Sequence, residues 1–217
     1  MLTLERARYW YPNYDAVHGF DHIERVYGLC EVIGPQENAD MQILLAAALL
    51  HDARGSQPGK GQRHGHHIES AKFAQQILRD EAWSQDRINA VKHCIESHRF
   101  RKNTPPSTVE AKILFDADKL DVIGAIGVVR ALAYANQVKQ PAYAKPSDRF
   151  LKHGDKVDGE PHSAYHEYIY KLQHIASLMF TNTAKEVAKQ RQYFLNRFFE
   201  QLKTEVESSR SRKAMLK

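Results

Sequence analysis

Apolar residues recur along this chain at intervals of three and four, which is the spacing of one face of an α-helix. The stretch 21–33 is typical, with Ile23, Val26, Cys30 and Ile33 on one side. We find no convincing alternation of apolar and polar residues, which is the pattern of a half-buried strand. The pattern therefore predicts an all-α fold.

The same periodicity, with helix-start and helix-stop signals, sets the expected boundaries. Two S/T-x-x-E capping boxes, at Ser107–Glu110 and Thr183–Glu186, each precede an expected helix. A polar loop with three prolines and two glycines fills about 139–162. The expected helices are 3–10; 21–33, ended by Gly34-Pro35; one from after Asn38 to His51 or Asp52; 66–83; 85–98; a long helix carrying 111–135; 163–179; and 183–207.

Composition changes this picture little. Of the 217 residues, 42% are hydrophobic and 26% charged, which is ordinary for a soluble globular protein. The longest apolar run is too short to span a bilayer, so we expect a cytoplasmic protein without a membrane partner. Cys30 and Cys94 lack metal-type or disulfide-type spacing, so we expect buried, reduced thiols. The net charge of +5 favours anionic partners only weakly.

Four polar side chains stand out against the helical pattern. The apolar run "ILLAAALL" ends directly in His51 and Asp52, where a carboxylate at the edge of a core costs several kcal/mol, on the order of 2–7, unless it is paired. His22 lies near the start of an earlier helix, and Asp118 lies on or near a core-facing stripe of a later one. Two imidazoles and two carboxylates that converge in a helical bundle would offset this cost by binding a divalent cation.

The donor types limit which metal ions the site could bind. The set contains nitrogen and oxygen donors and no thiolate, which suits Mn, Mg, Fe, Co, Ni or Zn. A metal with open coordination positions could hold water and a substrate oxygen, which is what metal-assisted hydrolysis needs.

This ordered set resembles the HD-domain superfamily of metal-dependent phosphohydrolases. The segments "HGFDHIERVY", "AAALLHD", "HHIESAKFAQQIL", "CIESHRF" and "EAKILFDADKLDVIGAIGVVRA" are similar to a subgroup of small, stand-alone predicted HD hydrolases. The resemblance covers roughly residues 15–207. It implies that His22, His51, Asp52 and Asp118 are the metal ligands. One departure is Gly19, where many relatives have Asp; a supporting role of that Asp is absent here or taken by Asp21.

The resemblance also implies one HD-type domain over residues 1–217. We expect a single helical bundle with its core at about 15–138, the loop at about 139–162, a C-terminal helical extension at about 163–207, and a basic tail at 208–217.

Further residues near this set have alternative interpretations. Arg25 contacts a phosphate, holds a ligand carboxylate, or is a surface residue. Lys60 and Arg63 belong to a Gly-rich basic loop that clamps a phosphate chain or is simply solvated. Asp121 orients a ligand histidine or the nucleophilic water, or forms a structural ion pair.

Three histidines raise the question of a second ion. Some HD enzymes bind a second metal through two additional histidines, for which His66, His67 and His98 are the candidates. His98 lies on the inward face of its helix. The alternative is that these are hydrogen-bonded histidines near the site.

The function implied by the resemblance is metal-dependent phosphohydrolysis by a metal-activated water. Nucleotides are the expected substrates, cut as phosphomonoesters or as triphosphates to monophosphate and diphosphate. The alternatives are a di-iron HD-type oxygenase, which requires His66 or His67 together with His98, and a non-enzymatic nucleotide-binding protein. We expect no nucleic-acid partner, and aromatic residues of the last helix form either core or a homodimer face.

Overall fold

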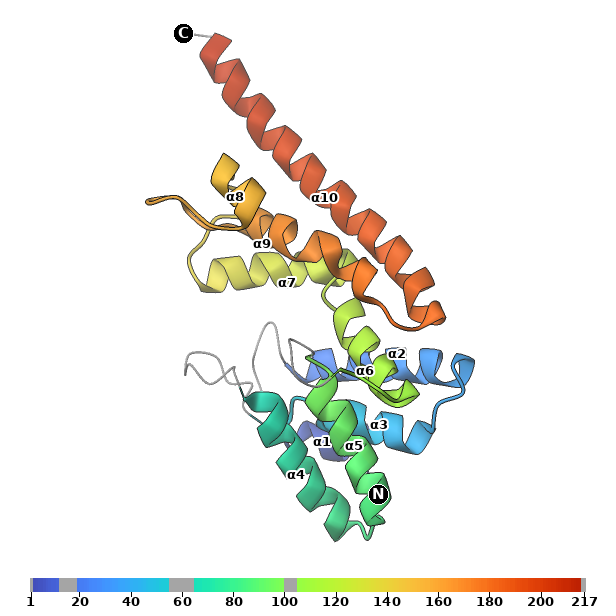
Figure 1. Cartoon of the computed structure of the whole chain (residues 1–217). Coiled ribbons are helices and arrows are strands. Elements are labelled where there is room, and N and C mark those ends of the chain that lie inside the picture. Colours follow the sequence, from blue (N-terminus) through green and yellow to red (C-terminus); the bar gives the residue numbers. More distant parts are fainter. Residues whose placement is uncertain (1, 12–18, 55–64, 100–104, 216–217) are drawn as a thin grey trace. The chain divides into compact units, whose positions relative to one another are not determined.

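All regular structure in the described part of the chain is helical. The computed structural model describes residues 2–11, 19–54, 65–99 and 105–215. Within these ranges there are ten α-helices, one 3-10 helix and no strand (Figure 1). The predicted all-α class is therefore confirmed.

The helices of the described ranges are drawn in chain order in Figure 1. None in the described ranges is long and apolar enough to cross a membrane. In chain order they are α1 (Leu4–Arg8), α2 (Phe20–Gln36), α3 (Met41–Leu50), α4 (His66–Asp80), α5 (Gln85–Ser97), α6 (Val109–Leu120), α7 (Gly124–Gln137), α8 (Asp148–His153), α9 (Ala164–Tyr170), the 3-10 helix η1 (Leu172–Leu178) and α10 (Asn182–Met215).

The chain divides into two compact units. The N-terminal unit comprises Met1–Asp121 and Met179–Lys185, and the C-terminal unit comprises Val122–Leu178 and Glu186–Lys217. In the N-terminal unit α2, α3, α5 and α6 pack against one another, and α4 packs on α5. Helix α3 is the centre of this core, because residues 46–50 are all buried.

Helix α2 is longer than its stop signal predicts. It includes Gly34 and Pro35 in its last turn, so the predicted end at Ile33 is wrong. A Cβ atom on Gly34 would lie 2.4 Å from the Met41 sulfur and 2.8 Å from a Leu44 methyl group. The glycine therefore serves the close approach of α3 to α2 rather than ending the helix.

The helix expected over 111–135 is in fact two helices. Helix α6 ends at Leu120, and α7 begins at Gly124, whose φ of +74° lies in the left-handed region that favours glycine. Gly124 also allows the close approach of α10, because a Cβ atom at this position would lie 3.1 Å from the Arg191 side chain. The break sets the boundary between the two units at residue 121.

Neither predicted capping box forms. Thr108 rather than Ser107 caps α6, because its Oγ1 accepts a hydrogen bond from the Ala111 amide at 3.2 Å. Thr181 Oγ1 accepts from the Ala184 amide at 3.3 Å at the start of α10, so Thr183 is not the cap. Thr108 thus directly follows the predicted cap Ser107, and Thr181 lies two residues before the predicted cap Thr183.

The C-terminal unit is more helical than predicted. Helix α8 lies within the expected loop 139–162, the expected helix 163–179 is α9 followed by η1, and α10 extends past 207 to Met215. The Glu160 carboxylate orders the loop around α8. It accepts hydrogen bonds from the Ser147 amide and hydroxyl, both at 2.7 Å, and from the Val157 amide at 2.9 Å.

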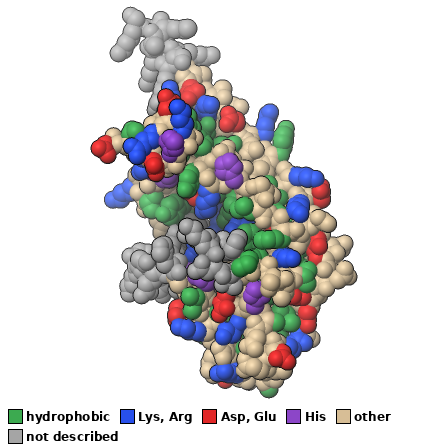
Figure 2. All heavy atoms as spheres, in the orientation of Figure 1, with side chains coloured by type: hydrophobic (Ala, Val, Ile, Leu, Met, Phe, Trp, Pro, Cys, Tyr) green, Lys and Arg blue, Asp and Glu red, His purple; other side chains and the backbone are tan. Residues whose placement is uncertain are grey.

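The two cysteines lie where the sequence predicts, in the interior. Cys30 and Cys94 are free and buried, as predicted, and burial raises the pKa of both thiols. On the face drawn in Figure 2, cationic and anionic side chains are interspersed, which fits a modest net charge.

Asp116 ties α6 to the segment before α10 within the N-terminal unit. Its buried carboxylate accepts from the Phe180 amide at 2.9 Å, the Thr181 amide at 2.8 Å and the Thr181 hydroxyl at 2.7 Å. We expect Asp116→Ala to lower the free energy of unfolding by about 2–3 kcal/mol, because it leaves these donors without an acceptor. Urea unfolding followed by circular dichroism measures this; Asp158→Ala, at an exposed site, is the control. Equal midpoints for the two variants would contradict the prediction.

Candidate metal centre

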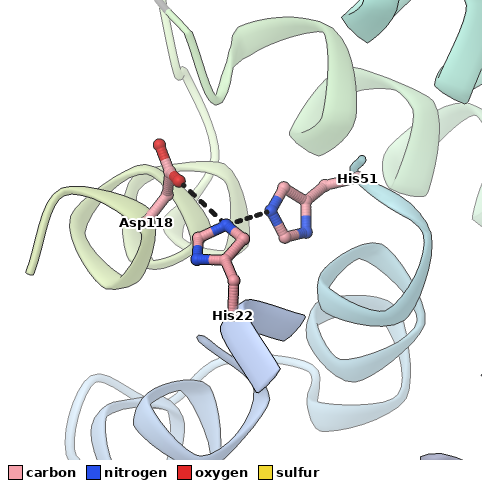
Figure 3. Close-up of side chains that lie close together, drawn as sticks. All are labelled: His22, His51 and Asp118. Atoms are coloured by element: carbon pink, nitrogen blue, oxygen red, sulfur yellow. Dashed lines mark hydrogen bonds and ion pairs between the residues drawn. The ribbon is translucent and has the colours of Figure 1, made fainter. Parts of the chain in front are cut away.

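Three helices bring His22, His51 and Asp118 together in the N-terminal unit. His22 lies in the first turn of α2, His51 directly follows α3, and Asp118 lies in α6. One ligand atom from each lies within 4.8 Å of the others. The Nε2 atom of His22 is 3.4 Å from Nε2 of His51 and 3.5 Å from Oδ1 of Asp118 (Figure 3). We call these residues the first triad.

Asp52, His66 and His98 form a second triad, all of them buried. The Asp52 Oδ1 atom lies 3.3 Å from Nε2 of His66 and 3.4 Å from Nε2 of His98. It accepts no hydrogen bond from any described residue. Its other oxygen lies 4.0 Å from Nε2 of His51, so Asp52 lies at the junction of the two triads. The partners of the carboxylate at the end of α3 are therefore mainly the histidines of α4 and α5.

Two of the histidines are oriented by the helix ends that carry them. His51 donates Nδ1–H to the Ala48 carbonyl at 2.8 Å, and His98 donates to the Ile95 carbonyl at 2.6 Å. A carbonyl only accepts, so the proton must reside on Nδ1. In the neutral ring this leaves the Nε2 lone pair facing the triads, which is the orientation that a metal ligand requires.

His22 is oriented by a carboxylate instead. Its Nδ1 donates to Oδ2 of Asp121 at 2.7 Å. Arg25 donates to the same carboxylate from Nε at 2.6 Å and from Nη2 at 3.1 Å, and donates to Asp21 at 2.6 Å. The geometry favours the interpretation in which Asp121 orients a ligand histidine and Arg25 holds that carboxylate.

The first triad has the chemistry that a divalent cation fits. Two Nε2 lone pairs 3.4 Å apart repel each other unless a proton or a cation lies between them. Burial lowers the pKa of His51 to about 4, although Asp52 partly offsets this, so a proton is disfavoured at neutral pH. Imidazole nitrogens with a carboxylate suit the metals named above, and no thiolate among the described residues joins either triad.

Both carboxylates of the triads are ionised at neutral pH. Burial alone would raise the pKa of Asp118, but the Lys119 ammonium and His22 hold it well below its usual range. Burial likewise opposes ionisation of Asp52, but the neighbouring imidazoles of His51, His66 and His98 outweigh it and lower the pKa of this carboxyl. The donors therefore need not lose a proton when a cation binds near neutral pH.

Sequence reasoning missed two cations beside the triads. Lys119 Nζ donates to Oδ2 of Asp118 at 2.5 Å and to the His98 carbonyl at 3.4 Å, so it contacts a residue from each triad. Arg99 Nη1 lies 2.9 Å from Nδ1 of His66. Lys119 directly follows the ligand candidate in "DADKLD", which is a signal that could have identified it.

The other candidates fall away from the triads or outside the described residues. His67 is half-buried beside His66 and belongs to neither triad. Lys60 and Arg63 lie outside the described residues, so the basic loop stays a prediction. The assignment of individual residues as metal ligands also stays a prediction.

Removing the partner of His22 tests its orientation. We expect Asp121→Ala to weaken Mn²⁺ affinity about 10–100-fold, because the ring loses the bond that fixes its tautomer and direction. Isothermal titration calorimetry measures this. Asp21→Ala is the matched control, since the Asp21 carboxylate binds the same arginine from an exposed position and is not a partner of the His22 ring. If both variants lost the same amount of Mn²⁺ affinity, Asp121 would act only through Arg25.

The burial of His51 predicts a pH dependence for the metal-free protein. In the unfolded chain a histidine takes up its proton near pH 6.5, whereas the lowered pKa of His51 in the folded protein is about 4. The stability that neutral His51 contributes is therefore full above about pH 6.5 and is lost as the pH falls toward 4. An NMR titration of the chelated protein should give a His51 midpoint near pH 4; a midpoint near 6.5 would contradict the burial argument.

Comparison with known proteins agrees with this geometry. The family model "HD domain" matches residues 19–123, which include both triads. Bacillus subtilis YpgQ, an uncharacterized protein, is 30% identical over 193 residues, covering 87% of this chain and 84% of YpgQ.

Solved structures extend the similarity to nearly the whole chain. The crystal structure of Bacillus subtilis YpgQ in complex with ADP has a TM-score of 0.70 at 28% identity and covers 94% of this chain and 98% of that one. An HD-superfamily hydrolase from Bacillus thuringiensis has a TM-score of 0.69 at 25% identity and covers 94% of both chains. This protein therefore belongs to the HD-domain superfamily and has the fold of its hydrolases.

Proposed function

We propose that this protein is a metal-dependent phosphohydrolase that acts on nucleotides, with His22, His51, Asp52 and Asp118 as its metal ligands. The observation that carries the proposal is the first triad, in which His22 and His51 are buried and Asp118 is partly buried, and in which the His51 ring is neutral and the carboxylate is ionised at neutral pH. Burying such a set is costly unless a cation binds it. Asp52 would bind the same cation through its Oδ2 atom, which lies 4.0 Å from Nε2 of His51.

A divalent ion held by these side chains would lower the pKa of a bound water and neutralise charge on a phosphate. The side chains of the protein contribute orientation and charge. Asp121 keeps the His22 proton on Nδ1, and Lys119 holds Oδ2 of Asp118, so that Oδ1 faces the imidazoles. Lys119 also adds a positive charge beside the centre, which favours an anionic substrate.

Nucleotides are proposed as substrates on two grounds. The chain carries a net charge of +5, which suits polyanionic ligands. YpgQ, a relative of similar length and fold, was crystallised with ADP. The Arg25 guanidinium bonds to Asp21 and Asp121, which belong to neither triad, whereas Lys119 contacts a residue of each triad. Lys119 is therefore better placed than Arg25 to contact a phosphate at the centre.

The second triad supports a second ion at Asp52, His66 and His98. The unbonded Asp52 Oδ1 atom faces both imidazoles, which is the donor arrangement that such an ion would use. The same triad also meets the ligand requirement of the di-iron oxygenase alternative. Metal content and dioxygen consumption separate the two, because hydrolysis needs neither bound iron nor dioxygen.

The test is an activity screen of the purified full-length chain. We expect phosphate or diphosphate release from nucleoside mono- or triphosphates when Mn²⁺, Co²⁺, Ni²⁺ or Mg²⁺ is added, measured by chromatography and phosphate assay. His51→Ala should lose more than about 100-fold of this rate, because even partners that only orient ligands are worth 10–100-fold. His153→Ala, an exposed histidine on α8, should retain it. A protein that binds these ions but releases nothing from any nucleotide would instead be a binding protein.

A further inference from the structure

Ser70, a fully buried serine of α4, bonds to the chain just beyond the end of α3. Its Oγ accepts a hydrogen bond from the Arg54 amide at 3.1 Å and donates one to the Arg54 carbonyl, also at 3.1 Å. Asp52 lies two residues before Arg54, and His66 lies one helical turn before Ser70. One hydroxyl thus joins the segment that carries Asp52 to the helix that carries His66.

This bond differs from the usual bond of a serine inside a helix. Such a serine commonly points to solvent or bonds to the carbonyl four residues earlier in its own helix. Ser97 in α5 follows this pattern, since its hydroxyl donates to the His93 carbonyl at 2.6 Å. The carbonyl four residues before Ser70 belongs to His66, but the Ser70 hydroxyl donates to Arg54. The Ser70 hydroxyl therefore serves the contact between two elements.

The chain after α3 runs beside the first turns of α4. Asp52 Oδ1 is 3.3 Å from Nε2 of His66. The Arg54–Ser70 bonds lie two residues further along the chain and four residues further along the helix. Two residues of chain span at most about 7 Å, and four helical residues rise about 6 Å, so the two contacts fit one another. The Arg54 guanidinium then lies over the Phe73 ring, 3.7 Å from its centre, on the same face of α4.

The direction of Asp52 depends on the main chain that carries it. No described residue donates a hydrogen bond to its buried Oδ1 atom. The covalent chain does not fix its distance from His66 either, because the ten residues 55–64 can span up to about 35 Å. The two hydrogen bonds between Arg54 and Ser70 are therefore the nearest polar link that holds Asp52 against α4.

The first triad is held independently of Ser70. His51 donates to the Ala48 carbonyl at 2.8 Å within its own helical turn. The Tyr11 hydroxyl donates to the Leu49 carbonyl, also at 2.8 Å, in the same turn. The other two members of this triad lie on α2 and α6, which pack against α3.

We propose that the Ser70 hydroxyl positions Asp52 against His66 and thereby sets the affinity of the second triad for a divalent ion. The proposal rests on the proposed function, in which this triad binds a second ion. Ser70 is a positioning residue and not a ligand, because its oxygen bonds to Arg54. Removing a group that orients a metal ligand weakens binding about 10–100-fold. This loss should fall on the second ion and leave the first in place.

Isothermal titration calorimetry with Mn²⁺ on the EDTA-treated, dialysed full-length protein measures both ions. We expect two Mn²⁺ ions in the wild type, and His66→Ala identifies which of them the second triad binds. Ser70→Ala should weaken that ion at least about tenfold and change the affinity for the other less than about threefold. The fold should persist, because alanine is the best helix former.

Ser97→Ala is the matched control. It removes an equally buried hydroxyl that bonds only to carbonyls of its own helix, so both ions should bind as they do in the wild type. Hydrogen exchange in excess EDTA tests the contact without metal. The Arg54 amide should exchange at least about tenfold faster in Ser70→Ala than in Ser97→Ala, because it loses its acceptor.

Four results would overturn the proposal. They are equal weakening of both ions in Ser70→Ala, wild-type affinity for the second ion in that variant, an unchanged Arg54 exchange rate, or a wild-type protein that binds a single Mn²⁺. A single ion together with nucleotide hydrolysis would leave the proposed function in place. Failure of the proposed function would instead appear as a protein that binds no Mn²⁺ and releases no phosphate in the activity screen.

Discussion

The hydrogen bonds at the outward nitrogens of the buried histidines are the interaction on which the rest of the centre depends. Each bond fixes the proton on Nδ1 and points the Nε2 lone pair inward. His51 and His98 use the same device, since each follows a helix and bonds to the carbonyl three residues earlier. That carbonyl belongs to the last turn and would otherwise lack a partner. One hydrogen bond thus satisfies a carbonyl of the last helical turn and orients the imidazole as a metal ligand would require.

Burial makes this arrangement both costly and selective. The surroundings that lower the pKa of His51 also penalise the charges of Asp52 and Asp118. Cationic and imidazole neighbours offset part of that cost, with Lys119 bonded directly to Asp118. A divalent cation would offset more of it, because it contacts nitrogen and oxygen donors at once. The centre is therefore better suited to a metal than to protons.

The sequence was sufficient to identify the helical class and to single out His22, His51 and Asp118, whose side chains lie together in the structure. Helical spacing placed Asp118 near a core-facing stripe, and the apolar run before His51 marked α3 as buried. Spacing along single helices could not show which histidines meet Asp52, because this depends on how α4 and α5 pack. Nor could it show that the helix expected over 111–135 is interrupted before Gly124, a residue with a positive φ. Local sequence patterns determine which face of each helix is buried, whereas the contacts between helices are a property of the folded core.

The central claim is that His22, His51 and Asp118 hold one divalent cation. Anomalous diffraction from a crystal soaked in Zn²⁺ tests it most directly. The claim predicts a peak about 2.0–2.2 Å from both Nε2 atoms and from an Asp118 oxygen, which is the usual range for zinc bound to nitrogen and oxygen. Fully loaded crystals with no peak between these three side chains, or with zinc bound only elsewhere, would contradict it.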